Sequence, residues 1–300
     1  MVLCLNRDKH MTALDKRLVG EQNTLDILTH LHRFGWLTSR MLAALVWPEA
    51  KQSQAMARRT LKTLTGQKLV IKRALAEGGD CYVLSAAGVR WLSDQAGIAA
   101  KAGSGLKLGN AVHRACSNWY LITRLLAGDI VWTEYEIQSG RAPLVTVAGK
   151  TPDGLVETRF GLVWVEVENA WKNRTERAKV VRFCRQCLLP GSEMAELAPN
   201  AHLFRVAIVS ATGEALRWMA QSLADEHASA NLSDTQAGDI ELAHLPVDKS
   251  LVAGSLQQCL LSDLLLRRAD QRERLAGSTG KAFPTEGHSI SLANHPDWPA

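Results

Sequence analysis

A short alternating segment limits the fold of this chain more than any other feature. In residues 163–168, three valines alternate with Trp164, Glu166 and Glu168, and this period of two predicts a buried strand. The two glutamates then project from the same face of that strand. Neighbouring carboxylates on a half-buried face repel one another and lose hydration, so such a pair normally needs a cation. A solvated strand face is the other interpretation of the same pattern.

A turn and a second strand bring a third carboxylate into the same region. Thr151-Pro152-Asp153-Gly154 is typical of a turn, and the apolar residues from Leu155 onward predict a strand that follows it. Carboxylate oxygens are hard ligands that suit Mg²⁺ or Mn²⁺. The sequence therefore predicts a divalent-cation site between two adjacent strands. Its predicted ligands are Asp153, Glu166 and Glu168.

Composition limits the class of protein. The 300 residues are enough for two domains, and 46% apolar and 22% charged residues are typical of a globular protein. No apolar run reaches the ~18 residues of a membrane span, and the N-terminal residues do not have the pattern of a signal peptide. Cys184 and Cys187 form a C-x-x-C, but they lie on an apolar helical face, which predicts buried thiols. We therefore expect a cytoplasmic protein.

Residues 20–97 have the pattern of a winged helix-turn-helix DNA-binding domain. The sequence predicts helices at 21–34, from Thr38 to Val46 and from Ser53 onward, and then two strands, at 69–75 and 81–84. Ser85 is predicted to cap a closing helix. The third helix of such a domain enters the major groove, although a basic solvated helix is the alternative. The predicted DNA contacts are Gln52, Gln54, Arg58, Arg59 and Lys62 on that helix, with Lys72 and Arg73 on the wing.

A second unit is predicted at residues 110–270, after a Gly-, Ala- and Lys-rich linker at 98–109. The order of helix, three strands, helix and strand predicts an α/β (or α+β) sandwich with a mixed sheet. The tail at 276–300 is predicted to be flexible. The predicted helices are at 110–126, 173–189, 212–225 and 254–268, and the predicted strands are at 130–137, 155–159, 162–168, 203–210 and 240–245.

This order, with Pro152-Asp153-Gly154 before one strand and Glu166-Val167-Glu168 ending the next, resembles the restriction-endonuclease-like, or PD-(D/E)xK, nuclease superfamily. In that superfamily a lysine usually follows the second acid by two residues, where this chain has Glu168. Lys172 comes four residues later. A displaced lysine behind a winged helix is similar to the replication-relaxation family, which includes the MobC-type relaxases of mobilisable plasmids. The resemblance covers about residues 20–250.

The resemblance implies a metal-dependent, site-directed DNA-nicking endonuclease that acts in plasmid or mobile-element mobilisation or replication. Asp153 and Glu166 would hold Mg²⁺ or Mn²⁺, and Glu168 would complete the ion's shell or orient the attacking water. Lys172 would offset charge on the phosphate or assist deprotonation of the nucleophile. The implied partners are DNA at a plasmid or mobile-element origin and other mobilisation or transposition proteins, with no membrane partner.

Several positions keep two interpretations. Lys179 is the alternative lysine, or it contacts phosphate or solvent. Glu134 and Glu136 share one face of the strand predicted at 130–137, where either an extra metal ligand or a solvated face explains them. His113 is interpreted as an ordinary helix residue. The displaced lysine also favours a second function, a non-catalytic DNA-binding regulator or replication accessory protein with a degenerate nuclease domain. A transposon-end endonuclease is a third alternative.

Overall fold

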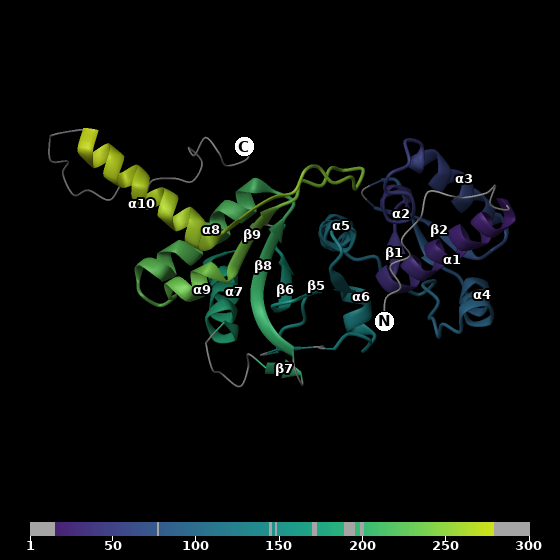
Figure 1. Ribbon diagram of the computed structural model, residues 1–300, viewed down its shortest axis with the longest axis horizontal. Coiled ribbons are helices and arrows are strands. Elements are labelled where there is room, and N and C mark those ends of the chain that lie inside the picture. The colour runs from purple at the N-terminus through teal and green to yellow at the C-terminus, as the bar shows by residue number, and fades with distance from the viewer. Residues whose placement is uncertain are drawn as a thin grey trace. The chain divides into compact units, whose positions relative to one another are not determined.

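The computed structural model describes residues 16–76, 78–143, 146–147, 149–169, 173–188, 196–198 and 201–278 (Figure 1). The chain divides into two compact units. The first ends at Leu106 and the second begins at Lys107, except that residues 74–79 of a hairpin group with the second unit. This division falls within the predicted linker. None of the helices in the described ranges is both long enough and apolar enough to cross a membrane.

The first unit combines four helices with a small sheet. The helices are α1 (Lys16–Phe34), α2 (Ser39–Val46), α3 (Ser53–Gly66) and α4 (Ala86–Ala96), and the strands are β1 (Trp36–Leu37), β2 (Val70–Ala74) and β3 (Asp80–Leu84), in the order β1-β3-β2. The predicted caps are confirmed: Thr38 Oγ1 accepts a hydrogen bond from the Met41 N–H at 3.3 Å, and Ser85 Oγ from the Gly88 N–H at 2.9 Å. The sequence did not predict β1, which is only two residues long and pairs antiparallel with β3.

Packing in the first unit fixes which face of each helix is buried. Ala57, Leu61 and Leu64 of α3 are almost fully buried, and the charged residues of that helix lie on the other side. At the start of α4, Gly88 lies against the backbone of Leu69. A side-chain carbon on Gly88 would be 2.3 Å from the Leu69 carbonyl oxygen, so this contact requires glycine.

The second unit is built on one large mixed sheet. Its strands are β4 (Ile130–Thr133), β5 (Gly154–Thr158), β6 (Gly161–Val167), β7 (Glu196–Ala198), β8 (Ala201–Ser210), β9 (Ile240–His244) and β10 (Gln257–Leu260), and its helices are α5 (Ala111–Leu126), α6 (Glu134–Gln138), α7 (Arg174–Cys187), α8 (Gly213–Ala228), α9 (Asp234–Gly238) and α10 (Leu261–Ser278). The strand order is β10-β9-β8-β6-β5-β4, with β7 beside β8. Strand β8 pairs parallel with β6 on one side and with β9 on the other, and the pairings β9–β10, β6–β5 and β5–β4 are antiparallel. This combination confirms the predicted mixed sheet.

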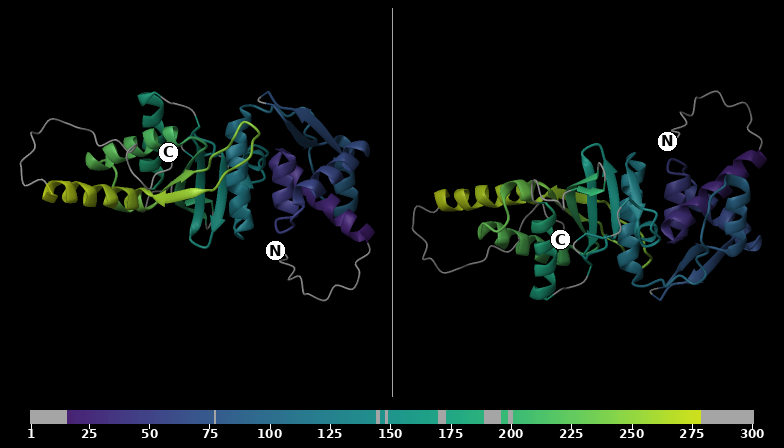
Figure 2. Two further views of the ribbon diagram at one scale, coloured as in Figure 1. Left: turned by 90° about the horizontal axis from the view of Figure 1, so that it is seen from above. Right: turned by 90° about the horizontal axis from the view of Figure 1, so that it is seen from below.

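Helices cover both faces of this sheet. Figures 1 and 2 show α5 on one side and α8 with α10 (yellow) on the other. Trp164, Ile208 and Leu242 point to the α7 and α8 side, where they join one buried cluster with residues of those helices. On the opposite face α5 approaches closely, since a side-chain carbon on Gly154 would lie 2.8 Å from Leu121. Successive residues of β5 and β6 therefore face different helices.

Most predicted elements of the second unit are present, with three corrections. The strand predicted at 130–137 stops at Thr133, because this residue caps α6 and turns the chain into a helix. The helix predicted at 254–268 is the edge strand β10 followed by α10. The flexible tail predicted from 276 is wrong for residues 276–278, which belong to α10; residues 279–300 lie outside the described residues.

The apolar stripe predicted for α7 is confirmed. Val180, Val181, Cys184, Cys187 and Leu188 are all buried. Both thiols are free. Burial raises the pKa of Cys184 to about 12 and that of Cys187 to about 11, as expected of inert core thiols.

Candidate functional site

Three hydrogen bonds, two with β6 and one with α5, fix the position of Asp153. Its N–H donates to the Val165 carbonyl at 3.0 Å, and its Oδ2 accepts from the Val167 N–H at 2.7 Å, so β6 holds both its backbone and its carboxylate. From α5, the Ser117 hydroxyl donates to the Asp153 carbonyl at 2.7 Å. The predicted turn therefore delivers this carboxylate to the end of β5, against the face covered by α5.

Asp153 is paired with His113, which the sequence analysis treated as an ordinary helix residue. His113 Nε2 lies 3.0 Å from Asp153 Oδ1, and the two side chains are 32% and 20% exposed. The Asn110 side chain caps α5 at the His113 N–H, which fixes the histidine in the first turn. Burial lowers the pKa of His113, but the hydrogen bond and the charge of Asp153, together with the charges of Glu134 and Glu168, outweigh burial, and the pKa is raised above its usual 6.5. The pair is thus an oriented imidazole that solvent reaches.

Two further carboxylates act on this pair. Glu134 begins α6, where its Oε2 lies 2.8 Å from Arg114 Nε and its Oε1 accepts from Gln138 Nε2 at 2.6 Å. Burial raises the pKa of Glu134; Arg114 opposes this shift, and Asp153 adds to it. Glu168 follows β6, is only 2% exposed, and its charge helps to raise the pKa of His113. We name these four residues, His113, Glu134, Asp153 and Glu168, the acid–histidine cluster.

Glu166 is not part of this cluster. Its Oε1 lies 2.5 Å from Lys150 Nζ, and its Oε2 accepts from Trp164 Nε1 at 3.2 Å. The ammonium of Lys150 also lies 5.2 Å from the ring centre of Phe183 in α7. Glu166 is therefore neutralised on the α7 side of the sheet, whereas the carboxylate of Asp153 meets α5.

The predicted three-carboxylate cation site is not assembled as expected. Within the described ranges, no group of three His, Cys, Asp or Glu side chains is placed to hold a metal ion. Asp153 and Glu166 have separate partners, and the carboxylate oxygens of both already accept hydrogen bonds. The side chains of Asp153, Glu166 and Glu168 are therefore not brought together into one three-carboxylate group in this arrangement.

The structure also reassigns the other residues proposed from the sequence. Lys172 lies outside the described residues. Lys179 is 62% exposed and pairs with Glu176 on its own helix at 2.7 Å, consistent with a solvated position. Glu136 lies in a helix and not in a strand, and its Oε2 accepts from the Thr133 N–H at 2.9 Å as half of a capping box. Its role is therefore structural.

The sequence did not predict Lys150 as the partner of Glu166, and it predicted His113 to be an ordinary helix residue and not the partner of Asp153. Lys150 is 16 residues from Glu166 in the chain, and His113 is 40 residues from Asp153. No local spacing rule joins residues so far apart. Only Lys150 lies near the predicted site in the sequence, two residues before Pro152 of the Pro-Asp-Gly turn.

Comparison with known proteins gives no further guide to this site. No protein-family model matches the chain, and no curated protein matches it either.

In the first unit, α3 presents the exposed positive charge that the sequence predicted. Arg58, Arg59 and Lys62 are all exposed, outside the buried stripe of Ala57, Leu61 and Leu64. Arg58 and Lys62 are four residues apart and share one flank, while Arg59 lies about 100° around the helix from Arg58. These three side chains can therefore contact a polyanion without disturbing the core.

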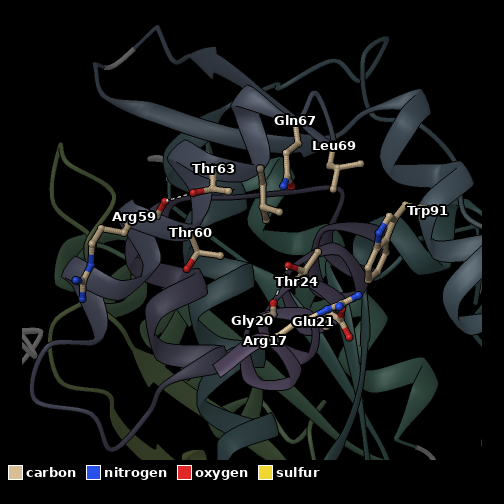
Figure 3. A pocket seen from close by; sticks show the side chains of 11 residues that line it. Arg17, Gly20, Glu21, Thr24, Arg59, Thr60, Thr63, Gln67, Leu69 and Trp91 are labelled. Carbon is tan, nitrogen blue, oxygen red and sulfur yellow. Dashed lines mark hydrogen bonds and ion pairs between the residues drawn. The ribbon is translucent and has the colours of Figure 1, made fainter. Parts of the chain in front are cut away.

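Arg59 also borders a hollow of about 460 Å³ formed by α1, α3 and α4. Figure 3 shows Arg59 at one side of this hollow and Trp91 at the other, with Thr60, Thr63 and Gln67 between them. The exposed surface of α3 is therefore divided. One flank carries Arg58 and Lys62, and the other opens into the hollow.

Three of the four remaining predicted DNA contacts have partners within the first unit. Gln54 donates to the Ser39 hydroxyl at 2.9 Å, which ties α3 to α2, and Gln52 is exposed just before α3. Lys72 pairs with Asp80 across the hairpin at 2.8 Å, and the hydrogen bond with Asp80 raises the pKa of Lys72. Arg73 Nη1 donates to the Leu106 carbonyl at 2.6 Å. Gln54, Lys72 and Arg73 therefore stabilise the unit, whether or not they also meet DNA.

Proposed function

We propose that this chain is a DNA-binding endonuclease that nicks DNA in the manner of a relaxase, with its chemistry at the acid–histidine cluster. The observation that carries the proposal is the hydrogen bond between His113 and Asp153, in a solvent-accessible position with Glu134 and Glu168 acting on the same imidazole. Perturbed titratable groups that converge in this way are typical of reaction centres.

The pair suits general acid–base catalysis. Asp153 holds the ring through Nε2, so Nδ1 is the nitrogen that exchanges a proton. In hydrolysis, neutral His113 would take a proton from water, the water oxygen would bond to phosphorus, and the bond from phosphorus to the leaving deoxyribose oxygen would break. The imidazolium would then return its proton to that oxygen. A carboxylate beside the ring stabilises the imidazolium that forms on the way.

The order of elements supports the fold that the resemblance implies. In the first unit, three helices are followed by the β2–β3 hairpin, the order of a winged helix-turn-helix with α3 as its recognition helix. In the second unit, α5, β4, β5, β6, α7 and β8 follow the α-β-β-β-α-β order of the restriction-endonuclease-like superfamily, with α6 inserted after β4. We propose that the first unit finds the DNA site and the second cuts it.

Nicking of supercoiled plasmid DNA that carries a mobilisation origin tests the proposal. Reactions with Mg²⁺, with Mn²⁺ and with a chelator determine whether a divalent cation is needed. We expect Asp153→Asn and His113→Gln to lower the nicking rate roughly 10²- to 10⁴-fold. The matched control is Glu157→Gln, which removes an exposed carboxylate from β5, the strand that follows Asp153, outside the cluster. Nicking by Asp153→Asn at the rate of the unaltered protein would refute the proposal.

The pH profile separates a proton-transfer role from a purely structural one. Because neutral His113 is the base, the nicking rate should rise with pH until the imidazole loses its proton, above pH 6.5. In Asp153→Asn the two largest interactions that raise this pKa, the hydrogen bond and the charge of Asp153, are changed or lost, so the residual activity should reach its plateau at lower pH. An unchanged profile would exclude His113 as the base.

One observation favours a second function, a DNA-binding regulator without nuclease activity. Lys150 and Trp164 already occupy the carboxylate of Glu166, which the resemblance assigns to the metal site. This alternative expects DNA binding that is weakened by Arg58→Ala, no nicking under any cation, and no heat of Mn²⁺ binding in calorimetry. Nicking that depends on Asp153 would exclude it.

A further inference from the structure

A pocket of about 420 Å³ lies at the end of β5 and β6 opposite the acid–histidine cluster. The β5–β6 turn, the last turn of α5 with the loop after it, the first half of β8, and β9 contribute to it. Its lining combines arginines with aromatic rings, namely Arg124, Arg159, Phe160, Phe204 and Arg205. None of these residues has a place in the chemistry proposed above.

The aromatic part of the pocket is a platform that the fold leaves open. Phe160 is 61% exposed in the turn between the two strands. Its ring centre lies 5.4 Å from that of Phe204, with 34° between the planes. An exposed phenylalanine loses the benefit of burial that this side chain normally gains. This pair is therefore well placed to take another flat ring.

Arginines surround the platform. The guanidinium of Arg159 lies 4.6 Å from the ring centre of Phe160, and that of Arg205 lies 4.7 Å from the ring centre of Phe204. Arg124 pairs with Asp129 at 2.8 Å, and Arg205 lies 3.8 Å from Glu241. Three arginines thus exceed the two acids of the pocket, and its electrostatic preference is for an anion.

We propose that this pocket binds a single strand of nucleic acid, with one base stacked on Phe160 and the adjoining phosphates held by the arginines. Aromatic stacking beside positive charge is how proteins hold unpaired strands, because every base has a flat face and every linkage a negative charge. In a duplex the bases are already stacked on one another, so the platform selects unpaired DNA or RNA. A free nucleotide also has a flat base and a phosphate, but it lacks the adjoining phosphates of a strand.

The position of the pocket extends the proposed function without depending on it. His113 and Arg124 are eleven residues apart on α5, a distance of about 16 Å at 1.5 Å per residue. Both sites lie on the face of the sheet that α5 covers. If nicking occurs at the cluster, the pocket would hold the unpaired strand next to the cut; if it does not, strand binding is still expected.

Fluorescence anisotropy with the full chain and a labelled oligothymidylate of about 12 nucleotides tests this inference. We expect Phe160→Leu, which keeps the apolar volume and removes the ring, to raise Kd roughly 5- to 100-fold. Arg159→Gln should reduce the slope of log Kd against log salt by about 0.7, as expected for one lost phosphate contact. The control is Trp218→Leu, which removes another exposed ring under an arginine, 5.5 Å from Arg177, outside the pocket.

Each outcome decides the inference. Weak binding by Phe160→Leu with normal binding by Trp218→Leu and by His113→Gln supports it and separates it from nicking. Equal Kd for Phe160→Leu and the unaltered protein overturns it. If thymidine monophosphate competes as strongly, per mole, as the unlabelled oligonucleotide, the ligand of the pocket is a nucleotide and the inference of a single strand is overturned. No binding of the oligonucleotide by the unaltered protein also overturns the inference. Unchanged thermal unfolding of Phe160→Leu confirms that the exposed ring does not stabilise the fold.

Discussion

Replacing Lys150 by methionine should destabilise the second unit, because it leaves the carboxylate of Glu166 without its cation. The Glu166 side chain is only 10% exposed and that of Lys150 is 28% exposed. Removing one partner of a fully buried ion pair costs about 3–5 kcal/mol. Since the ammonium is partly hydrated and Trp164 still donates to the carboxylate, we expect a smaller loss, roughly 1–3 kcal/mol.

A double-mutant cycle isolates the pair from other effects of the substitutions. Glu166→Gln alone keeps an acceptor for Trp164 and should lose roughly 1 kcal/mol. Lys150→Met combined with Glu166→Gln should be more stable than the sum of the single losses predicts, by roughly 1–2 kcal/mol. Urea unfolding followed by circular dichroism gives these free energies, with separate transitions fitted for the two units.

The cycle also decides what Glu166 does. A coupling below about 0.3 kcal/mol would show that Lys150 and Glu166 act independently, and would refute the pairing as the reason for the position of Glu166. In that case the carboxylate of Glu166 would be available to Mg²⁺ or Mn²⁺, as the resemblance to the nuclease superfamily implies. The matched control is Lys179→Met, which removes the exposed partner of Glu176 and should change stability by no more than about 0.5 kcal/mol.

Three more predictions concern the first unit, and urea unfolding measures each of them. Burial, with a smaller contribution from Arg33, lowers the pKa of His30 to about 4, so the imidazole is neutral in the folded protein. The free energy of unfolding should therefore be highest above pH 6.5 and should fall by up to roughly 2–3 kcal/mol as the pH drops through 4. His30→Gln should remove this pH dependence. Gly88→Ala should lose at least about 2 kcal/mol through its clash with the backbone of Leu69, whereas Gly20→Ala, which meets nothing within 4 Å, should be neutral or gain up to about 1 kcal/mol. Thr38→Ala should lose roughly 1 kcal/mol with the cap of α2, and an unchanged free energy of unfolding would contradict that role.

Local sequence signals predicted the elements well wherever one residue controls one boundary. Thr38 and Ser85 cap the helices that follow them, and the alternation through Trp164 predicted β6 with its two faces. The prediction was wrong at Glu134 and Glu136, where alternation suggested a strand. A capping box at Thr133 starts a helix there instead, because two hydrogen bonds at the helix end outweigh a weak preference for strand.

The candidate site could be predicted only in part. The turn residues placed Asp153 beside β6, and the structure agrees. The choice of partner for each carboxylate depended on residues far away in the chain, since α5 supplies His113 and the loop before the turn supplies Lys150. Glu166 and Glu168 were expected to share one ion, but Glu166 is neutralised by Lys150 and Glu168 acts on His113.

The sequence by itself determined which residues are in strands and helices and which chemistry is present, because hydrophobic period, caps and turns are local properties. It determined a two-unit chain with a basic helix in one unit and a group of acids in the other. Only the tertiary structure decided how those acids are divided. Opposite faces of one sheet are covered by different helices, so each carboxylate meets whatever cation its own helix or loop provides, and no spacing along the chain encodes that choice.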